Sequence, residues 1–208
     1  MHLEANSDAM DIDLRLKSLK PVVLRGERGL SQKGSRPGNA SYYYSYTRLA
    51  STGTLRIGGR TYAVSGSSWM DREWPTSALE PGQVGWDWFS PQLVDVMYYR
   101  LRRRDGAADP RSGGVLVDKD GGTERIAPDR FDIVVTGHWQ SPRSGADHPS
   151  RWHIMVPQHG LRLEVTPYVK DQELSGRLRY REGTVRVEDN QHRPLSSGYV
   201  ELVGYAQS

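Results

Sequence analysis

Cysteine is absent from this sequence of 208 residues. Without a thiol, disulfide scaffolds, thiolate metal sites and cysteine nucleophiles are all excluded. Long hydrophobic runs are missing too, since no apolar stretch approaches the roughly 20 residues of a membrane-spanning helix. The N-terminal stretch MHLEANSDAMDIDLRLK contains no apolar core of the kind that signal peptides carry. We therefore expect a soluble protein with no membrane span and no signal peptide in this chain.

The sequence also has little excess of one charge, because 28 basic and 25 acidic residues give a net charge of only +3. The densest basic run, residues 100–104, leads into the turn signal Asp105-Gly106, and we interpret it as the solvated end of a strand. A nucleic-acid partner is not expected. The sequence contains no GxGxxG, P-loop or GxSxG motif, so it indicates neither nucleotide binding nor a serine nucleophile, and no cofactor is expected.

No window of helical length shows an apolar period of 3.6 residues. Short segments alternate instead, as in residues 11–17, where Ile12, Leu14 and Leu16 share one face of a predicted strand. Turn signals recur about every 8–12 residues, which is typical of a sandwich or barrel. The sequence therefore predicts an all-β chain.

Hairpins are expected wherever two such segments flank a turn signal. The strongest signal is Gly58-Gly59, between the predicted strands Thr54–Ile57 and Thr61–Val64. Further hairpins are expected across residues 118–122, 157–160 and 182–183, whereas residues 25–40 are expected to form a long loop. Successive hairpins favour an up-and-down antiparallel β-barrel, whose closure removes strand edges and can leave room inside for a small ligand.

The stretch from Gly66 to Ser90 concentrates the unusual chemistry. It contains four of the six tryptophans, Trp69, Trp74, Trp86 and Trp88, and among them lie the carboxylates Asp71, Glu73 and Asp87. In GWDWFS, Trp86 and Trp88 share one strand face, and Asp87 lies on the other. A carboxylate beside indoles must be paired and hydrogen-bonded, or else it is held partly protonated by burial.

Histidine offers no metal-ligand pattern. Six histidines occur, at positions 2, 138, 148, 153, 159 and 192, and none belongs to an HxH or HExxH motif. His153 and His159 could approach each other across a hairpin, but solvated or core histidines are the simpler interpretation. We therefore expect no metal site.

Several segments together resemble the AttH-like/CrtC-like lipocalin-like family, which includes carotenoid 1,2-hydratase (hydroxyneurosporene synthase). They lie in order over nearly the whole chain: KPVVLRGERGLSQKG (20–34), YYYSYTRL (42–49), GSSWMDREW (66–74), GWDWFS (85–90), HWQSPRSG (138–145), DQEL (171–174) and GYVELVGY (198–205). The resemblance implies a lipocalin-like barrel preceded by a partial second barrel. Residues 1–75 would be the C-terminal half of a first domain, and residues 76–208 the whole second barrel.

Members of this family are normally longer, many are periplasmic, and some are associated with transporter systems. This chain departs from their pattern in a shortened turn after GWDWFS, in Arg181 where an aromatic residue is usual, and in Val203 where threonine is usual. The resemblance also implies either a missing N-terminal half-domain or a homodimer that completes the first barrel.

Two functions follow from the resemblance. The first is a binding protein for an apolar small molecule, a lipid or isoprenoid, with ligand contacts from Tyr42, Tyr44, Trp69, Trp74, Trp86 and Trp88. The second is a cofactor-independent hydratase or related cyclase in which Asp71 is the general acid and Glu73 and Asp87 are further candidate acids.

A structural role for Asp71, in a buried ion pair with Arg72, is the competing interpretation. An enzyme predicts that Asp71 lies in a cavity, faced by aromatic rings and without an arginine partner. A binder predicts an apolar cavity without a converging carboxylate.

Overall fold

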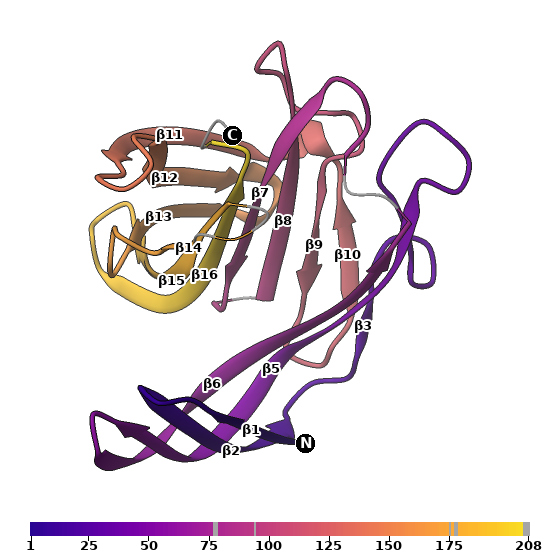
Figure 1. Cartoon of the computed structure of the whole chain (residues 1–208). Coiled ribbons are helices and arrows are strands. Elements are labelled where there is room, and N and C mark those ends of the chain that lie inside the picture. Colours follow the sequence, from indigo (N-terminus) through magenta and orange to yellow (C-terminus); the bar gives the residue numbers. More distant parts are fainter. Residues whose placement is uncertain (77–78, 94, 175, 177–178, 206–208) are drawn as a thin grey trace.

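A computed structural model of the chain describes residues 1–76, 79–93, 95–174, 176 and 179–205. Within these residues the strands form one six-stranded and one ten-stranded sheet, and every ladder is antiparallel (Figure 1). The described helical elements are two short 3-10 turns, η1 (Pro128–Arg130) and η2 (Pro157–His159). No helix in this part of the chain is long and apolar enough to cross a membrane. The all-β prediction is confirmed.

The first sheet, sheet A, is built on one long hairpin. Its strands are β1 (His2–Asn6), β2 (Met10–Ser18), β3 (Val23–Leu24), β4 (Leu30–Gln32), β5 (Ala40–Ile57) and β6 (Arg60–Pro75). β5 and β6 are joined at the expected turn, where Gly58 and Gly59 both have positive φ angles, 54° and 78°. β4 was not expected, because three residues are too few to show a strand period.

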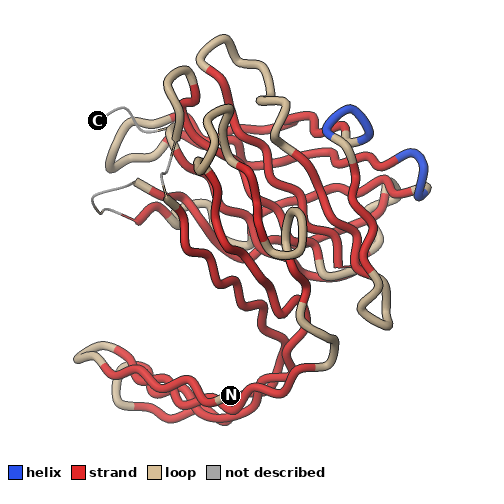
Figure 2. Tube along the Cα trace, turned by 90° about the vertical axis from the view of Figure 1, so that its right-hand side faces the viewer, coloured by secondary structure: helices blue, strands red, loops and turns tan. Residues whose placement is uncertain are grey.

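The β5–β6 hairpin is far longer than its contact with the second sheet. Its outer half projects as an arm that carries β1 and β2, as Figures 1 and 2 both show. Ile12, Leu14 and Leu16 are half-buried on one face of β2, as expected. Other apolar side chains of the arm are exposed, among them Leu3, Met10, Ile57 and Tyr62. Completion of this sheet by a partner or a further half-domain stays a prediction.

The second sheet, sheet B, contains two meanders that meet where β16 pairs with β7. Its strands are β7 (Gln83–Pro91), β8 (Asp95–Arg103), β9 (Gly113–Val117), β10 (Thr123–Ile126), β11 (Asp132–Gln140), β12 (Asp147–Val156), β13 (Leu161–Pro167), β14 (Glu173–Leu174), β15 (Tyr180–Asp189) and β16 (Pro194–Val203). The sheet curls strongly upon itself (Figure 1). No ladder joins β10 to β11 in the described residues, so the curl is open there.

The hairpins expected across residues 118–122 and 157–160 are present as β9–β10 and β12–β13. The prediction of a turn at Glu182-Gly183 is wrong, because β15 continues through these two residues. The strand pairs with β16 before and after them. Close packing explains the glycine: a Cβ added to Gly183 would lie 1.2 Å from Gln172 Oε1. The glycine therefore accommodates a neighbouring side chain and does not turn the chain.

The inside of the curl is filled by side chains. The buried cluster consists of Phe89, Tyr98, Ile126, Phe131, Trp152, Ile154, Val156, Leu163, Val165, Val185, Val187, Val200 and Leu202. Within the cluster Phe89 and Trp152 meet edge to face, with ring centroids 5.5 Å apart. Each such apolar side chain contributes about 1.5–3 kcal/mol by its burial. This cluster occupies the interior where a ligand was expected.

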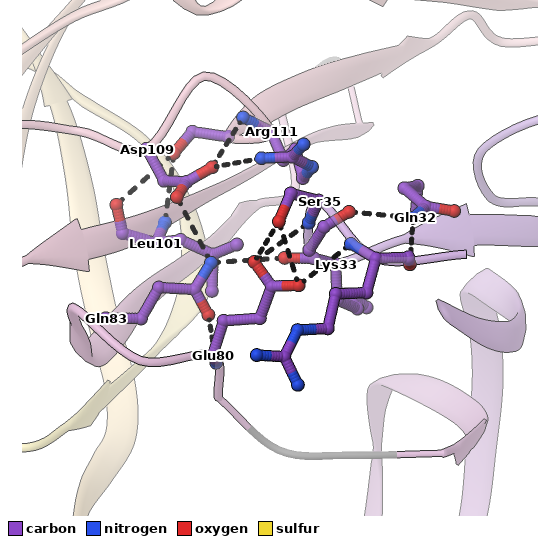
Figure 3. A network of polar contacts seen from close by, with 11 residues as sticks. Gln32, Lys33, Ser35, Glu80, Gln83, Leu101, Asp109 and Arg111 are labelled. Carbon is purple, nitrogen blue, oxygen red and sulfur yellow. Dashed lines mark hydrogen bonds and ion pairs between the residues drawn. The ribbon is translucent and has the colours of Figure 1, made fainter. Parts of the chain in front are cut away.

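A polar network around Glu80 and Gln83 ties the two sheets together (Figure 3). Glu80, which precedes β7, accepts hydrogen bonds from the backbone N–H groups of Ser35 at 2.8 Å and Arg36 at 3.1 Å. Gln83 donates to Lys33 O at 3.1 Å. These contacts fix how sheet A meets sheet B. The assignment of residues 1–75 and 76–208 to two lipocalin-like domains stays a prediction.

Candidate functional site

A cavity of about 480 Å³ lies where the inner half of β6 faces β7, β15 and β16. Its lining combines two indoles, two carboxylates and several hydroxyl groups: Ser67, Ser68, Trp69, Asp71, Trp88, Gln92, Thr184, Ser197, Gly198, Tyr199 and Glu201. Residues from both sheets therefore contribute to one site. Volumes of this size are typical of small-molecule sites.

Asp71 is half-buried in this lining and is surrounded by hydrogen-bond donors. Tyr43 donates its hydroxyl to Oδ2 at 2.9 Å, Trp69 donates Nε1–H to Oδ1 at 2.8 Å, and Ser45 donates to Oδ1. The pairing of Ser45 with Asp71 across β5 and β6 produces this arrangement, since alternate residues of both strands face the same side. In the described part of the chain no ion pair reaches Asp71, so the expected alternative of a pair with Arg72 is not observed.

Arg25 lies behind this group and is 1% exposed. Its Nε donates to Ser45 Oγ at 3.0 Å, and its guanidinium carbon lies 5.7 Å and 5.8 Å from the ring centroids of Tyr43 and Trp69. Burial lowers the pKa of Arg25, against the influence of the Tyr43 hydroxyl and of Asp71. Nη1 and Nη2 find no hydrogen-bond partner among the described residues. Arg25 thus reaches Asp71 through Ser45.

Of the four candidate tryptophans, two line the cavity and two do not. Trp69 and Trp88 meet edge to face in the cavity wall, with centroids 5.7 Å apart. Trp86, on the same face of β7 as Trp88, donates Nε1–H to Glu201 Oε1 at 2.5 Å. Trp74 lies away from the cavity lining, is 53% exposed and contacts Tyr44.

Glu201 is a site residue that the sequence did not reveal. It lies on β16, is half-buried and lines the same cavity as Asp71. Burial raises its pKa to about 7, the hydrogen bond from Trp86 opposes this shift, and the charges of Glu182, Asp71 and Glu73 add to it. The only available signal was its place in the segment GYVELVGY, and alternation alone could not indicate that Glu201 faces β6.

The other two candidate acids are engaged elsewhere. Glu73 pairs with Lys33 Nζ at 2.8 Å and accepts a hydrogen bond from Ser41 at 2.5 Å, outside the cavity lining. Asp87 is buried on the opposite face of β7, where Arg102 Nε lies 3.2 Å away and Tyr205 donates its hydroxyl at 2.8 Å. Burial raises the pKa of Asp87, and Arg102 opposes that shift.

The tyrosines expected to contact a ligand point away from the cavity. Tyr42 is 67% exposed, and Tyr44 packs beside Tyr46 and Trp74 on the outer face of sheet A. The intervening Tyr43 is the residue that reaches Asp71. Ligand contact by Tyr42 and Tyr44 therefore stays a prediction that this cavity does not support.

Possible metal ligands gather on the outer face of sheet B, away from the cavity. Among the described residues, ligand atoms of Glu164, Glu188 and His192 lie within 4.8 Å of one another. Arg151 lies 3.7 Å from Glu164, and Arg186 lies 3.2 Å from Glu188. The arginines already compensate these carboxylates, so an ion-pair network accounts for the group. The expectation of no metal site stays a prediction.

Comparisons with known proteins point to one family. A family model described as AttH-like matches residues 1–205. Kievitone hydratase from Fusarium solani subsp. phaseoli is 21% identical over 211 residues, which cover 96% of this chain and 58% of that protein.

Two solved structures have the same fold. A Nitrosomonas europaea protein assigned to AttH matches with a TM-score of 0.89 and 30% identity, over 99% of this chain and 65% of that one. Kievitone hydratase from Nectria haematococca matches with a TM-score of 0.75 and 18% identity, over 98% and 64%. The chain thus spans less than two thirds of the length of each relative.

Proposed function

The chain belongs to the AttH-like family, and from this premise we propose that it adds water to a carbon–carbon double bond of an apolar small molecule. The observation that carries the proposal is the position of Asp71, in a cavity walled by Trp69 and Trp88, where no ion pair reaches it from the described residues. The kievitone hydratases are hydratases by name. An isoprenoid alkene is the proposed class of substrate.

The cavity supplies what such a reaction needs. Protonation of an isolated alkene requires a carboxylic acid, and the carbocation that forms is stabilised by the faces of aromatic rings. Trp69 and Trp88 are in the wall beside the carboxylates, where a cation would develop. Tyr43 and Ser45 hold Asp71 in a fixed orientation through their hydroxyl groups. Fixed donors of this kind lose little free energy to reorganisation during a reaction.

Binding without chemistry is the second candidate function. The volume of about 480 Å³ suits a small ligand, and two indoles offer it a flat apolar wall. A carrier would use these walls and would not need Asp71. The two functions therefore predict different consequences of changing this carboxylate.

The test is hydration of kievitone and of a panel of isoprenoid alkenes in H₂¹⁸O, followed by mass spectrometry of the products. We expect the wild type to incorporate one labelled oxygen, and Asp71→Asn to lower the rate at least about 10²-fold. Tyr42→Phe is the control, because this hydroxyl lies outside the site. Retention of an unconverted alkene in native mass spectra, equal in wild type and Asp71→Asn, would favour the carrier.

A further inference from the structure

Two carboxylates from different sheets line one cavity. Asp71 comes from β6 of sheet A, and Glu201 comes from β16 of sheet B. They are close enough that the charge of Asp71 disfavours ionisation of Glu201. Paired carboxylates whose surroundings differ are the arrangement that separates an acid from a base within one site.

The surroundings of the two groups differ in kind. Hydroxyl and indole donors surround Asp71, and Arg25 stands behind Ser45. Hydrogen bonds of this kind favour a negatively charged acceptor. Asp71 thus accepts three hydrogen bonds from fixed donors, an arrangement that suits a proton acceptor better than the acid role that the sequence indicated.

Glu201, in contrast to Asp71, accepts one hydrogen bond and has acidic neighbours. Trp86 donates to Oε1, and no cation lies within ion-pairing distance of Glu201 in the described residues. The titratable groups that face it are acidic: Glu182, its register partner on β15, Asp71 and Glu73 on β6, and the phenols Tyr180 and Tyr199. Burial and these neighbours raise its pKa to about 7, so a large share of Glu201 carries a proton at neutral pH.

We propose that Glu201 donates the proton to the alkene and that Asp71 takes a proton from the attacking water, an inference that rests on the proposed function. The π electrons of the double bond form a C–H bond with the Glu201 proton, which leaves Glu201 as a carboxylate. A carbocation forms at the neighbouring carbon, beside the cavity wall that Trp69 and Trp88 form.

The reaction then closes without a further reactant. The oxygen of water bonds to the carbocation, and Asp71 takes one of its protons. The product is an alcohol, and transfer of the proton from Asp71 to Glu201 through solvent restores the starting state. Atoms and charge balance as alkene plus water gives alcohol.

A purely structural Glu201 is the competing explanation, in which the side chain serves only to accept the hydrogen bond from Trp86. Glu201→Gln separates the two, since glutamine offers the same acceptor without an acidic proton. We expect a loss in kcat of about 10²–10⁴-fold toward every alkene that the wild type hydrates, and loss of the decline in rate near neutral pH. Wild-type kcat and pH profile in Glu201→Gln would overturn the assignment.

Glu182→Gln is the matched control, because Glu182 neighbours Glu201 and does not line the cavity. This variant should stay active, and the decline in its rate should move to lower pH, because one negative neighbour of Glu201 has been removed. A merely structural Glu201 would leave the pH profile unmoved. Glu201→Asp keeps a carboxylic acid but shortens the side chain by one methylene. If Glu201→Gln impairs folding, the kcat and pH profile of Glu201→Asp test the donor role instead.

A measurement independent of turnover completes the test. Carboxyl ¹³C NMR of the wild type, assigned with Glu201→Gln, should show a group that titrates near pH 7. A resonance fully ionised at about pH 5 would overturn the donor role. If the wild type hydrates alkenes and Glu201→Gln does so equally, only the Glu201 assignment fails. If the wild type hydrates none, the proposed function fails and the donor role with it.

Discussion

Trp69 on β6 and Trp88 on β7 meet edge to face, with ring centroids 5.7 Å apart and ring planes at 80°. This contact joins the two sheets at the wall of the cavity, because Trp69 belongs to sheet A and Trp88 to sheet B. It also brings Asp71 toward Glu201, since Trp69 donates a hydrogen bond to Asp71 and Trp88 pairs in register with Glu201. The stability of the site therefore depends on aromatic packing between the sheets.

Trp88→Ala should lower the free energy of unfolding by about 3–5 kcal/mol, because it removes a side chain that is only 8% exposed. Trp88→Phe should cost less, since it keeps a ring against Trp69 and Nε1 of Trp88 has no hydrogen-bond partner in the described residues. Denaturant unfolding of both variants measures the difference. Equal losses would show that the contact with Trp69 contributes nothing.

Tyr43→Phe should lower kcat/KM by about 10–100-fold, because a hydrogen bond to a charged group contributes about 1.5–3 kcal/mol. The ring stays in place beside Arg25, so the free energy of unfolding should fall by no more than the contribution of this one hydrogen bond. Tyr42→Phe, one residue earlier and exposed, should keep the wild-type rate. Steady-state kinetics of the two variants make the comparison, and the reverse ranking would mean that the wrong face of β5 has been assigned to the site.

Asp87→Asn should destabilise the fold by about 3–5 kcal/mol, because it leaves Arg102 buried without its carboxylate. Asparagine can still accept the hydrogen bond from Tyr205. Asp105→Asn breaks the exposed pair with Arg103 and should cost under about 1 kcal/mol. Thermal or urea unfolding tests both. A stable Asp87→Asn protein without activity would instead support the catalytic role first considered for Asp87.

The stability of the protein should fall as pH rises from about 4.5 to about 7, through Glu201. The unfolded chain releases this proton near its ordinary pKa of 4.5, whereas the folded protein holds it until about 7, so the folded state binds the proton more tightly. The resulting loss is on the order of 3 kcal/mol and is complete above pH 7. Glu201→Gln should remove this decline. If the unfolding midpoints of wild type and Glu201→Gln change by the same amount between pH 4.5 and 7, the raised pKa of Glu201 is contradicted.

Glu80 should give the opposite pH dependence, in which the stability of the protein falls as pH decreases. Backbone hydrogen bonds from Ser35 lower its pKa to about 2, with Asn39 and the Arg36 backbone contributing further. Its stabilising effect is therefore complete above its ordinary pKa of 4.5 and disappears as pH falls toward 2. Wild type should unfold at higher urea than Glu80→Gln at neutral pH, and the two midpoints should converge on acidification. A constant gap down to pH 2 would refute this account of the junction.

In the aromatic segments, the sequence predicts which residues share a strand face, but it does not predict which face is turned inward. Alternation correctly placed Trp86 and Trp88 on one face of β7 and Asp87 on the other. On β5 it separated Tyr42 and Tyr44 from Tyr43, but it could not say which set faces inward, because that depends on the strands packed against the hairpin.

Local properties of this chain could be predicted from its residues alone: the alternating strands, the Gly58-Gly59 turn, and the gathering of indoles and carboxylates within Gly66–Ser90. These follow from neighbouring residues, since backbone preference and two-residue alternation act over a few positions. Packing of the folded chain, in contrast, brings Asp71 and Glu201 into one cavity lining and places Asp87 beside Arg102. Those pairings join residues distant in sequence, and they depend on how two curved sheets approach each other.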